Sequence, residues 1–196
     1  MRQAAHQMAE GARALGYPED HPIILLAKQE HLEASNLKKG YQSVYDNLKE
    51  HWQQKRKEYP TATYIWEYLK NLGYNDYICA GVLGNIMAEV GGNTLNIQAM
   101  ISGNGYYGMC QWNKAYSNIW GASLEEQCDY LRDTIEYEFN TFGYAYKRNF
   151  DYDSFLELTD MKDAALAFAK AYERCGSGSY YKRQQNAIIA YNYFVS

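Results

Sequence analysis

The residue whose surroundings most suggest chemistry is Glu89, in the stretch GVLGNIMAEVGGN at residues 81–93. The stretch has the pattern of a helix end that closes at two glycines. On a helical wheel at about 100° per residue, Glu89 falls between Ile78 and Val82, inside the apolar arc but at one margin of it. Apolar surroundings favour the protonated form of a carboxyl group, which is the form that a general acid needs. The alternative is an ordinary helical glutamate that reaches water or pairs with a lysine.

Histidine is missing from residues 61–196, because all four histidines of the chain precede Pro60. Nucleophilic Ser–His and Cys–His chemistry needs an imidazole beside the nucleophile, so a peptidase or amidase is disfavoured. Histidine-based zinc hydrolysis is disfavoured for the same reason, and the four cysteines have no CxxC spacing. We therefore expect carboxylate chemistry without a metal or another cofactor.

The charge distribution excludes other function classes. Residues 61–196 hold 10 Lys/Arg against 15 Asp/Glu, without the basic stripe that nucleic-acid binding needs. The sequence contains no run of 18 apolar residues, so no membrane-spanning helix is predicted. The first residues also lack the continuous apolar segment of a signal peptide.

Pro60 divides the chain into a predicted helical N-terminal arm or linker, residues 1–60, and a main domain, residues 61–196. Pro22 is suited to open a helix in the arm. A short heptad-like seam then follows, interrupted by Gly40 and formed by Ala34, Leu37, Tyr41, Val44 and Leu48. We expect this seam to contact the main domain or a partner protein.

The main domain is predicted to be mostly α-helical, which places Glu89 at a helix end. Apolar periodicity and glycine stops predict helices over residues 63–72 and 75–90, and later over 160–174 and 180–194. The sequence Ser123-Leu-Glu-Glu126 is a capping-box pattern that starts a further helix. Residues 92–121 carry Gly, Asn and Ser, and are expected to form a loop with a short β-hairpin.

Three motifs follow one another in the main domain: Ala88-Glu89-Val90, then Gly108-Met109-Cys110-Gln111-Trp112, then Tyr172-Glu173-Arg174. Their order and spacing resemble the phage tail lysozyme family of the lysozyme-like superfamily, over about residues 63–195. The resemblance implies a lysozyme-like α-helical domain, with the N-terminal arm outside it. Val90 departs from the family pattern, which often has serine after the acid, so a hydrogen bond from that serine is lost.

The resemblance also implies an activity and its residues. The enzyme would be a muramidase-like hydrolase that cuts the glycan strands of bacterial peptidoglycan, with Glu89 as general acid. It would act from a virion tail or as a prophage product. Separately from the resemblance, we expect the N-terminal arm to contact other virion tail proteins. Trp112 suits a packing anchor as well as a sugar platform. The substrate-binding residues carried over are Tyr107, Gln111, Trp112, Tyr172 and Glu173.

Two mechanisms and one non-catalytic reading stay open. Glycosidases commonly use two carboxylates, yet no Asp or Glu lies between Glu89 and Glu125. Hydrolysis would need a second carboxylate from elsewhere, whereas a lytic transglycosylase would use the 6-hydroxyl of the sugar and one acid/base residue. A wall-binding or structural virion module would need neither. The candidates for a second carboxylate are Glu125, Asp151, Asp153 and Glu173.

Overall fold

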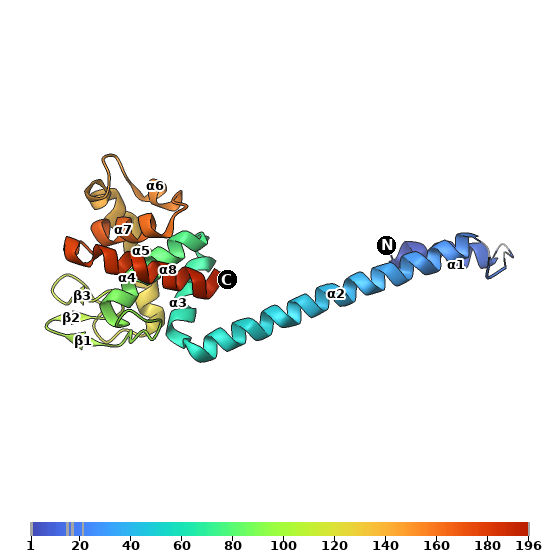
Figure 1. Cartoon of the computed structure of the whole chain (residues 1–196), viewed down its shortest axis with the longest axis horizontal. Helices are drawn as coiled ribbons and strands as arrows, with labels where there is room; N and C mark the ends of the chain where they lie inside the picture. Colours follow the sequence, from blue (N-terminus) through green and yellow to red (C-terminus); the bar gives the residue numbers. More distant parts are fainter. Residues whose placement is uncertain (1, 15, 17, 21, 196) are drawn as a thin grey trace. The chain divides into compact units, whose positions relative to one another are not determined.

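The computed structural model describes residues 2–14, 16, 18–20 and 22–195. Met1 and Ser196, the ends of the two predicted segments, and His21 lie outside the described residues. Eight α-helices are found in the described part of the chain (Figure 1). They are α1 (Arg2–Ala14), α2 (Pro22–Glu58), α3 (Pro60–Asn71), α4 (Asp76–Val90), α5 (Leu124–Phe142), α6 (Tyr152–Leu156), α7 (Met161–Ala171) and α8 (Tyr180–Val195).

The remaining elements are short. Two 3-10 helices occur among the residues that the structure describes, η1 (Gly143–Ala145) and η2 (Ser177–Ser179). Strands β1 (Ser102–Gly103), β2 (Tyr106–Tyr107) and β3 (Trp112–Asn113) form an antiparallel sheet in that order. The predicted mostly α fold with a short β-hairpin region is confirmed. None of the helices in the described ranges combines the length and the apolar character needed to cross a bilayer.

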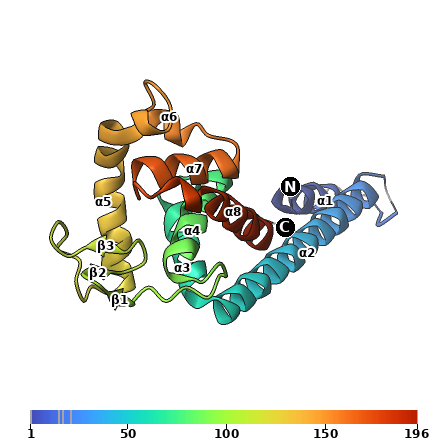
Figure 2. The same ribbon diagram turned by 60° about the vertical axis from the view of Figure 1, so that its left-hand side comes forward.

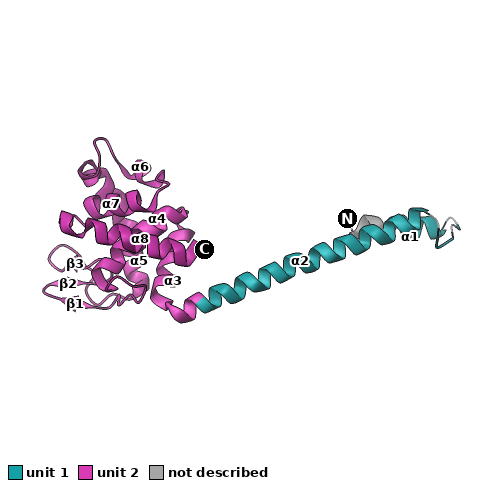
Figure 3. Cartoon of the chain, viewed as in Figure 1, with its two compact units in different colours: residues 1–54 teal, residues 55–196 magenta. Residues whose placement is uncertain are grey.

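The chain separates into two compact units, residues 1–54 and residues 55–196 (Figure 3). In the first unit α1 lies along the start of α2, and small side chains bury the contact, among them Ala9 and Ala27. Farther along α2 the side chains of the predicted seam are solvent-exposed, including Leu37, Tyr41 and Val44. The predicted boundary at Pro60 and the predicted contact of the seam stay predictions.

The helices of the second unit begin where the sequence offers caps. Pro60 occupies the first turn of α3, which therefore starts three residues before the expected Thr63. Asn75 caps α4 by accepting a hydrogen bond from the Ile78 N–H at 3.0 Å. The capping box of α5 forms as predicted, with Ser123 and Glu126 each bonded to the backbone of the other.

Helix α4 is the central element of the second unit and packs mainly against α7 and α8 (Figure 2). It is buried on nearly all sides, because close-packed small residues let its neighbours approach. A Cβ at Gly84 would lie 2.5 Å from the backbone nitrogen of Ala187 on α8. A Cβ at Gly81 would lie 2.6 Å from the Cβ of Ala164 on α7. The last turn of α4, which carries Glu89, is therefore held against α8.

Two local differences from expectation have simple causes. Helix α7 ends at Ala171 where the sequence predicted Arg174, because Arg174 adopts φ +50°, in the left-handed region. Helix α6 was not predicted, since five residues are too few to show a helical period. It begins at an Asp151 cap, whose side chain accepts a hydrogen bond from Ser154 N at 2.9 Å.

Candidate active site

Glu89 lies on the last turn of α4, and its side chain is 22% exposed. Most of its helix is buried, so the carboxyl group stands where the helix wall meets solvent. This agrees with the position expected from the helical wheel. From the sequence, the alternative to a catalytic role was an ion pair between Glu89 and a lysine. In the structure Glu89 does form an ion pair, but with an arginine.

That partner is Arg183 on α8, whose side chain is only 5% exposed. Its Nη2 donates a hydrogen bond to Oε1 of Glu89. Its Nη1 donates to Oδ1 of Asn85 at 3.0 Å. Asn85 is itself fixed, because its Nδ2 donates to the carbonyls of Gly81 at 2.8 Å and Ala165 at 3.0 Å. Three helices thus orient the Glu89 carboxylate through one buried polar chain.

A second carboxyl group, that of Glu173, lies behind this pair, just after α7. Burial first, and the charge of Glu89 second, raise the pKa of Glu173 to about 8. The residue is half-buried, but its Oε1 is shielded from solvent and has no hydrogen-bond partner among the described residues. The Cys110 thiol lies close enough to favour the carboxylate slightly, without a regular hydrogen bond to Oε1. Burial therefore favours the protonated form of Glu173.

Trp112 is tied to the helical core through Tyr172, the residue before Glu173 in the chain. The Nε1 of Trp112 donates to the Tyr172 hydroxyl at 3.1 Å. Thr134 on α5 donates to the Tyr130 carbonyl at 2.7 Å, so its hydroxyl oxygen accepts from Tyr172 at 2.8 Å. The Trp112 ring also meets the Tyr130 ring edge to face, with centroids 5.3 Å apart. Trp112 is half-buried, which suits both a packing and a binding role.

Tyr107 and Gln111 shape the β region. Tyr107 is buried on β2, pairs with Trp112 across the sheet, and donates its hydroxyl to the Ala122 carbonyl at 2.9 Å. Gln111 adopts φ +48° and its Nε2 donates to the Gly108 carbonyl at 2.9 Å. Both side chains thus brace the loop that presents Trp112. Cys110 belongs to the same loop and interacts with Glu173, so this loop lies next to Glu173.

The arrangement offers acid–base chemistry by carboxyl groups. One carboxylate is oriented at the edge of solvent, and the pKa of a second carboxyl group near it is raised by burial. No group of three or more His, Cys, Asp or Glu side chains within the described ranges is arranged to hold a metal ion.

A family model for phage tail lysozymes matches residues 60–194 of the chain. This match covers well over half of the sequence and includes every residue of the candidate active site. The chain belongs to the phage tail lysozyme family. No curated protein and no solved structure matches it in the corresponding searches. Membership identifies the protein as a phage-associated lytic enzyme that acts on peptidoglycan.

Two pairs of the predicted site residues interact in the structure. Glu89 and Glu173 interact with one another, and Trp112 and Tyr172 share a hydrogen bond. Asn85 and Arg183 were not among the predicted site residues. A signal for Arg183 was present, because it lies four residues before Ala187 and eleven before Phe194, on the apolar face of α8. A buried arginine on such a face needs an anionic partner.

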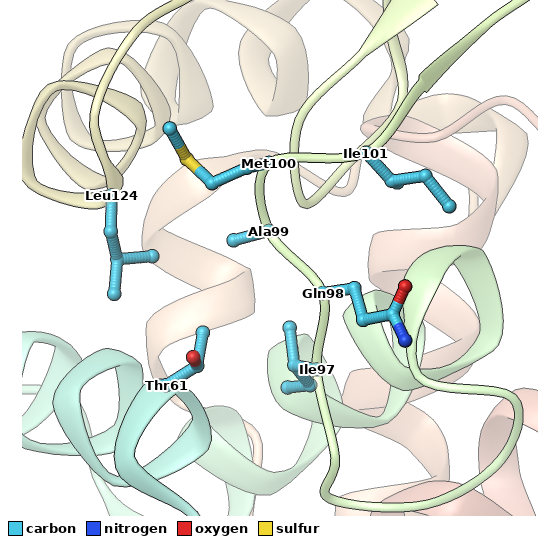
Figure 4. Close-up of a pocket in the computed structure, with 7 residues that line it drawn as sticks. All are labelled: Thr61, Ile97, Gln98, Ala99, Met100, Ile101 and Leu124. Atoms are coloured by element: carbon cyan, nitrogen blue, oxygen red, sulfur yellow. The ribbon is translucent and has the colours of Figure 1, made fainter.

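A mainly apolar pocket of about 400 Å³ lies along the loop that follows α4 (Figure 4). Its volume is within the range of small-molecule sites. The backbone nitrogen of Gln98 donates to the Val90 carbonyl at 3.3 Å, so this loop is joined to the residue after Glu89. The pocket is lined by Thr61, Ile97, Gln98, Ala99, Met100, Ile101 and Leu124.

Proposed function

We propose that this enzyme cleaves the glycan strands of peptidoglycan, with Glu89 as the general acid that protonates the glycosidic oxygen. The observation that carries the proposal is the placement of Glu89, the only carboxylate that combines partial exposure with a buried orienting arginine in the described part of the chain. A residue whose orientation is fixed before substrate binds is suited to proton transfer.

Five residues are assigned supporting roles in this proposal. Trp112 offers its ring to a sugar, and Tyr172 holds that ring in place. Tyr107 and Gln111 brace the loop that presents Trp112. Glu173 acts beside Glu89 rather than as a freely exposed sugar ligand, because its Oε1 is shielded from solvent.

The family relationship favours hydrolysis over transglycosylation. The chemical ends of the released glycan products distinguish these two reactions. Among the candidate second carboxylates, Glu125 and Asp153 are exposed, and Asp151 is engaged as the α6 cap. Glu173 is the one that interacts electrostatically with Glu89. A water molecule activated at a distance and an internal attack by the 6-hydroxyl of the sugar are the two routes.

The deciding experiment is mass spectrometry of soluble products from purified peptidoglycan, with the wild type beside Glu89→Gln. The exposed Glu157→Gln is the matched control. We expect reducing-end muropeptides from the wild type and the control, and none from Glu89→Gln. Anhydro ends would identify a lytic transglycosylase. Full activity of Glu89→Gln would refute the assignment, and wall binding without products from any protein would identify a non-catalytic binding module.

We further propose that the N-terminal arm contacts other virion tail proteins. The support is the row of exposed apolar side chains on α2, which includes Leu37, Val44 and Leu48. Exposed apolar stripes at helical spacing commonly mark sites of protein association. Co-purification of the arm with tail proteins of the same phage would support this contact, and a failure of all of them to bind would refute it.

A further inference from the structure

A further cavity of the second unit, called here the α7–α8 pocket, lies where the chain passes from α7 to α8. Its volume is about 250 Å³. None of its lining residues takes part in the hydrogen bonds that orient Glu89, and within the described part of the chain none of them is Asp or Glu. Two cations and three aromatic side chains are among them: Lys170, Arg174, Phe142, Tyr144 and Tyr180.

Lys170 presents a positive charge to this pocket. Its Nζ lies 5.6 Å from the ring centroid of Tyr180 and 6.0 Å from that of Tyr146. These rings attract the ammonium group and restrict its position, but they do not neutralise it. The lysines that pair with carboxylates in the described part of the chain are Lys28 and Lys70. The charge of Lys170 is therefore available to an anionic ligand.

Arg174 adds a second cation whose orientation is set by two neighbours. Its Nη1 donates a hydrogen bond to Glu138 of α5. Its guanidinium carbon lies 4.6 Å from the centroid of the Phe142 ring. Because a guanidinium has several N–H donors in one plane, the bond to Glu138 leaves donors for a further carboxylate. Arg174 can thus bind a ligand while it stays anchored to α5.

The surroundings of the pocket are basic, although the domain as a whole is acidic. Residues 61–196 hold 10 Lys/Arg against 15 Asp/Glu. The one acidic residue of the two segments that line most of the pocket, 142–148 and 170–175, is Glu173, whose Oε1 is shielded from solvent. Positive charge gathered at one place on an acidic domain indicates an anionic ligand there. Four of the ten cations lie on these two segments: Lys147, Arg148, Lys170 and Arg174.

The size and the lining of the pocket select the kind of anion. A cavity of about 250 Å³ is smaller than sites that enclose a drug-sized molecule, so it suits one residue at a chain end rather than a disaccharide. A terminal carboxylate would pair with Lys170 and Arg174. A small apolar side chain beside that carboxylate would meet the aromatic rings. Peptidoglycan supplies such ends, because its glycan strands bear short peptides that finish in a small residue with a free carboxylate.

We propose that the α7–α8 pocket binds the carboxy terminus of a peptidoglycan stem peptide, with Lys170 and Arg174 on the carboxylate and Tyr144 beside the terminal side chain. The inference deepens the proposed function and rests on it for the effect on glycan cleavage. Tyr180 begins α8 and lies within one turn of Arg183, the residue that orients Glu89. A stem peptide held in the pocket is therefore anchored at the end of α8 that serves Glu89. The enzyme should prefer glycan that carries peptides to bare glycan.

The first test is an NMR titration of the full chain with N-acetyl-D-alanyl-D-alanine and, as the matched ligand, its carboxamide. We expect the wild type to bind the acid and not the amide. Lys170→Gln should weaken binding of the acid about fivefold, because one cation facing the carboxylate is lost, whereas Lys170→Arg should keep most of it. Tyr144→Ala, at a side chain that is 69% exposed, should weaken binding without a change in thermal stability. Lys162→Gln, at an exposed lysine of the same helix, is the control.

The second test is turnover on two substrates. In Lys170→Gln, KM on peptidoglycan should rise about fivefold with kcat retained, whereas KM on glycan strands freed of their peptides should equal that of the wild type. An equal rise of KM on both substrates would overturn the inference.

The binding results separate the inference from the proposed function. Equal binding of the acid and the amide, or unchanged binding of the acid in both Lys170→Gln and Tyr144→Ala, would overturn the inference. Preferential binding of glycerol phosphate would also overturn it, and would identify a phosphate-bearing wall polymer as the occupant. A wild type that binds the acid but releases no glycan products would overturn the proposed function and support the assignment of the pocket.

Discussion

The hydroxyl of Tyr172 lies 3.1 Å from Nε1 of Trp112 and is the hydrogen-bond acceptor of that ring. Tyr172 is itself buried, stacked on Phe168 with ring centroids 4.7 Å apart. The orientation of Trp112 therefore depends on the helical core, although Trp112 belongs to a β-strand. A sugar that stacks on Trp112 would meet a ring that is already fixed, which lowers the entropic cost of binding.

Tyr172→Phe is predicted to weaken both stability and substrate binding. It removes the acceptor of Trp112 and the donor to Thr134 while keeping the ring. The free energy of unfolding should fall by about 1–3 kcal/mol, because two groups lose their hydrogen-bond partner. KM on solubilised glycan should rise more than kcat falls. Tyr137→Phe, at an exposed tyrosine, is the control, and equal KM values for the two variants would contradict the role of Tyr172.

Asn85→Ala is predicted to impair catalysis through Arg183. The substitution removes the Oδ1 that accepts from Arg183 at 3.0 Å, and so leaves Nη1 of this buried guanidinium with only the long hydrogen bond to the residue 85 carbonyl at 3.4 Å. We expect a loss of about 1–3 kcal/mol in the free energy of unfolding and a lower kcat. Denaturant unfolding and turnover on purified walls measure the two effects. Asn192→Ala, at an exposed position of α8, should change neither.

Gly84→Ala is predicted to disrupt the packing of α4 on α8. The added methyl group would meet the backbone of Ala187 at 2.5 Å and the Arg183 carbonyl at 2.8 Å. Because backbone atoms cannot rotate away, the helices must separate, at a cost of about 1–3 kcal/mol or more. Activity should fall as well, since Arg183 moves with α8. Gly178→Ala, where an added Cβ meets nothing within 4 Å, is the matched control. Equal stability of the two variants would contradict the tight contact.

Stability should decrease as the pH rises from about 4.5 to about 8, and Glu173 should cause much of this decrease. Its pKa is raised from 4.5 to about 8 on folding, so within this window the folded state binds a proton that the unfolded state has lost. The cost grows through the window and is constant above it, on the order of a few kcal/mol. Glu173→Gln should therefore exceed the wild type in stability at pH 8 and match it at pH 4. Thermal unfolding at several pH values measures this, and parallel curves would contradict it.

Removal of the N-terminal arm is predicted to change stability or assembly more than turnover, and the cut site should matter. Lys55 is buried in the second unit and donates to the Tyr193 carbonyl, while Thr63 Oγ1 donates to the Lys55 carbonyl at 3.0 Å. A chain of residues 55–196 should therefore be more stable than one of residues 59–196, by about 1–3 kcal/mol. Thermal unfolding and turnover of both chains test this. Identical melting would contradict the anchoring role of Lys55.

Much of the fold was predictable because its helices start and stop at recognisable residues. Ser123 and Asn75 are caps whose side chains bond to the backbone as their types suggest. The order of the three motifs identified the family, and the helical wheel placed Glu89 at the edge of the apolar arc. These signals are formed by residues that are close in sequence, so they can be recognised without knowledge of the tertiary structure.

The partners of Glu89 were not predictable in the same way. Arg183 and Glu173 lie 94 and 84 positions beyond Glu89 in the chain, and only the packing of α4, α7 and α8 brings them together. The raised pKa of Glu173 likewise depends on burial, which no sequence period around residue 173 reveals. The candidate carboxylates could be listed from the sequence, but the sequence did not show which of them would interact with an arginine.

The anchoring of Lys55 has a mechanical consequence. Helix α8 carries Arg183 near its beginning and Tyr193 near its end, and Lys55 holds the Tyr193 end. Tension applied to the chain before residue 55 therefore enters the second unit at the far end of the helix that orients Glu89. The load acts first on the Lys55 contacts with Tyr193 and Thr63, so that the Glu89–Arg183 pair is shielded from strain until those contacts break.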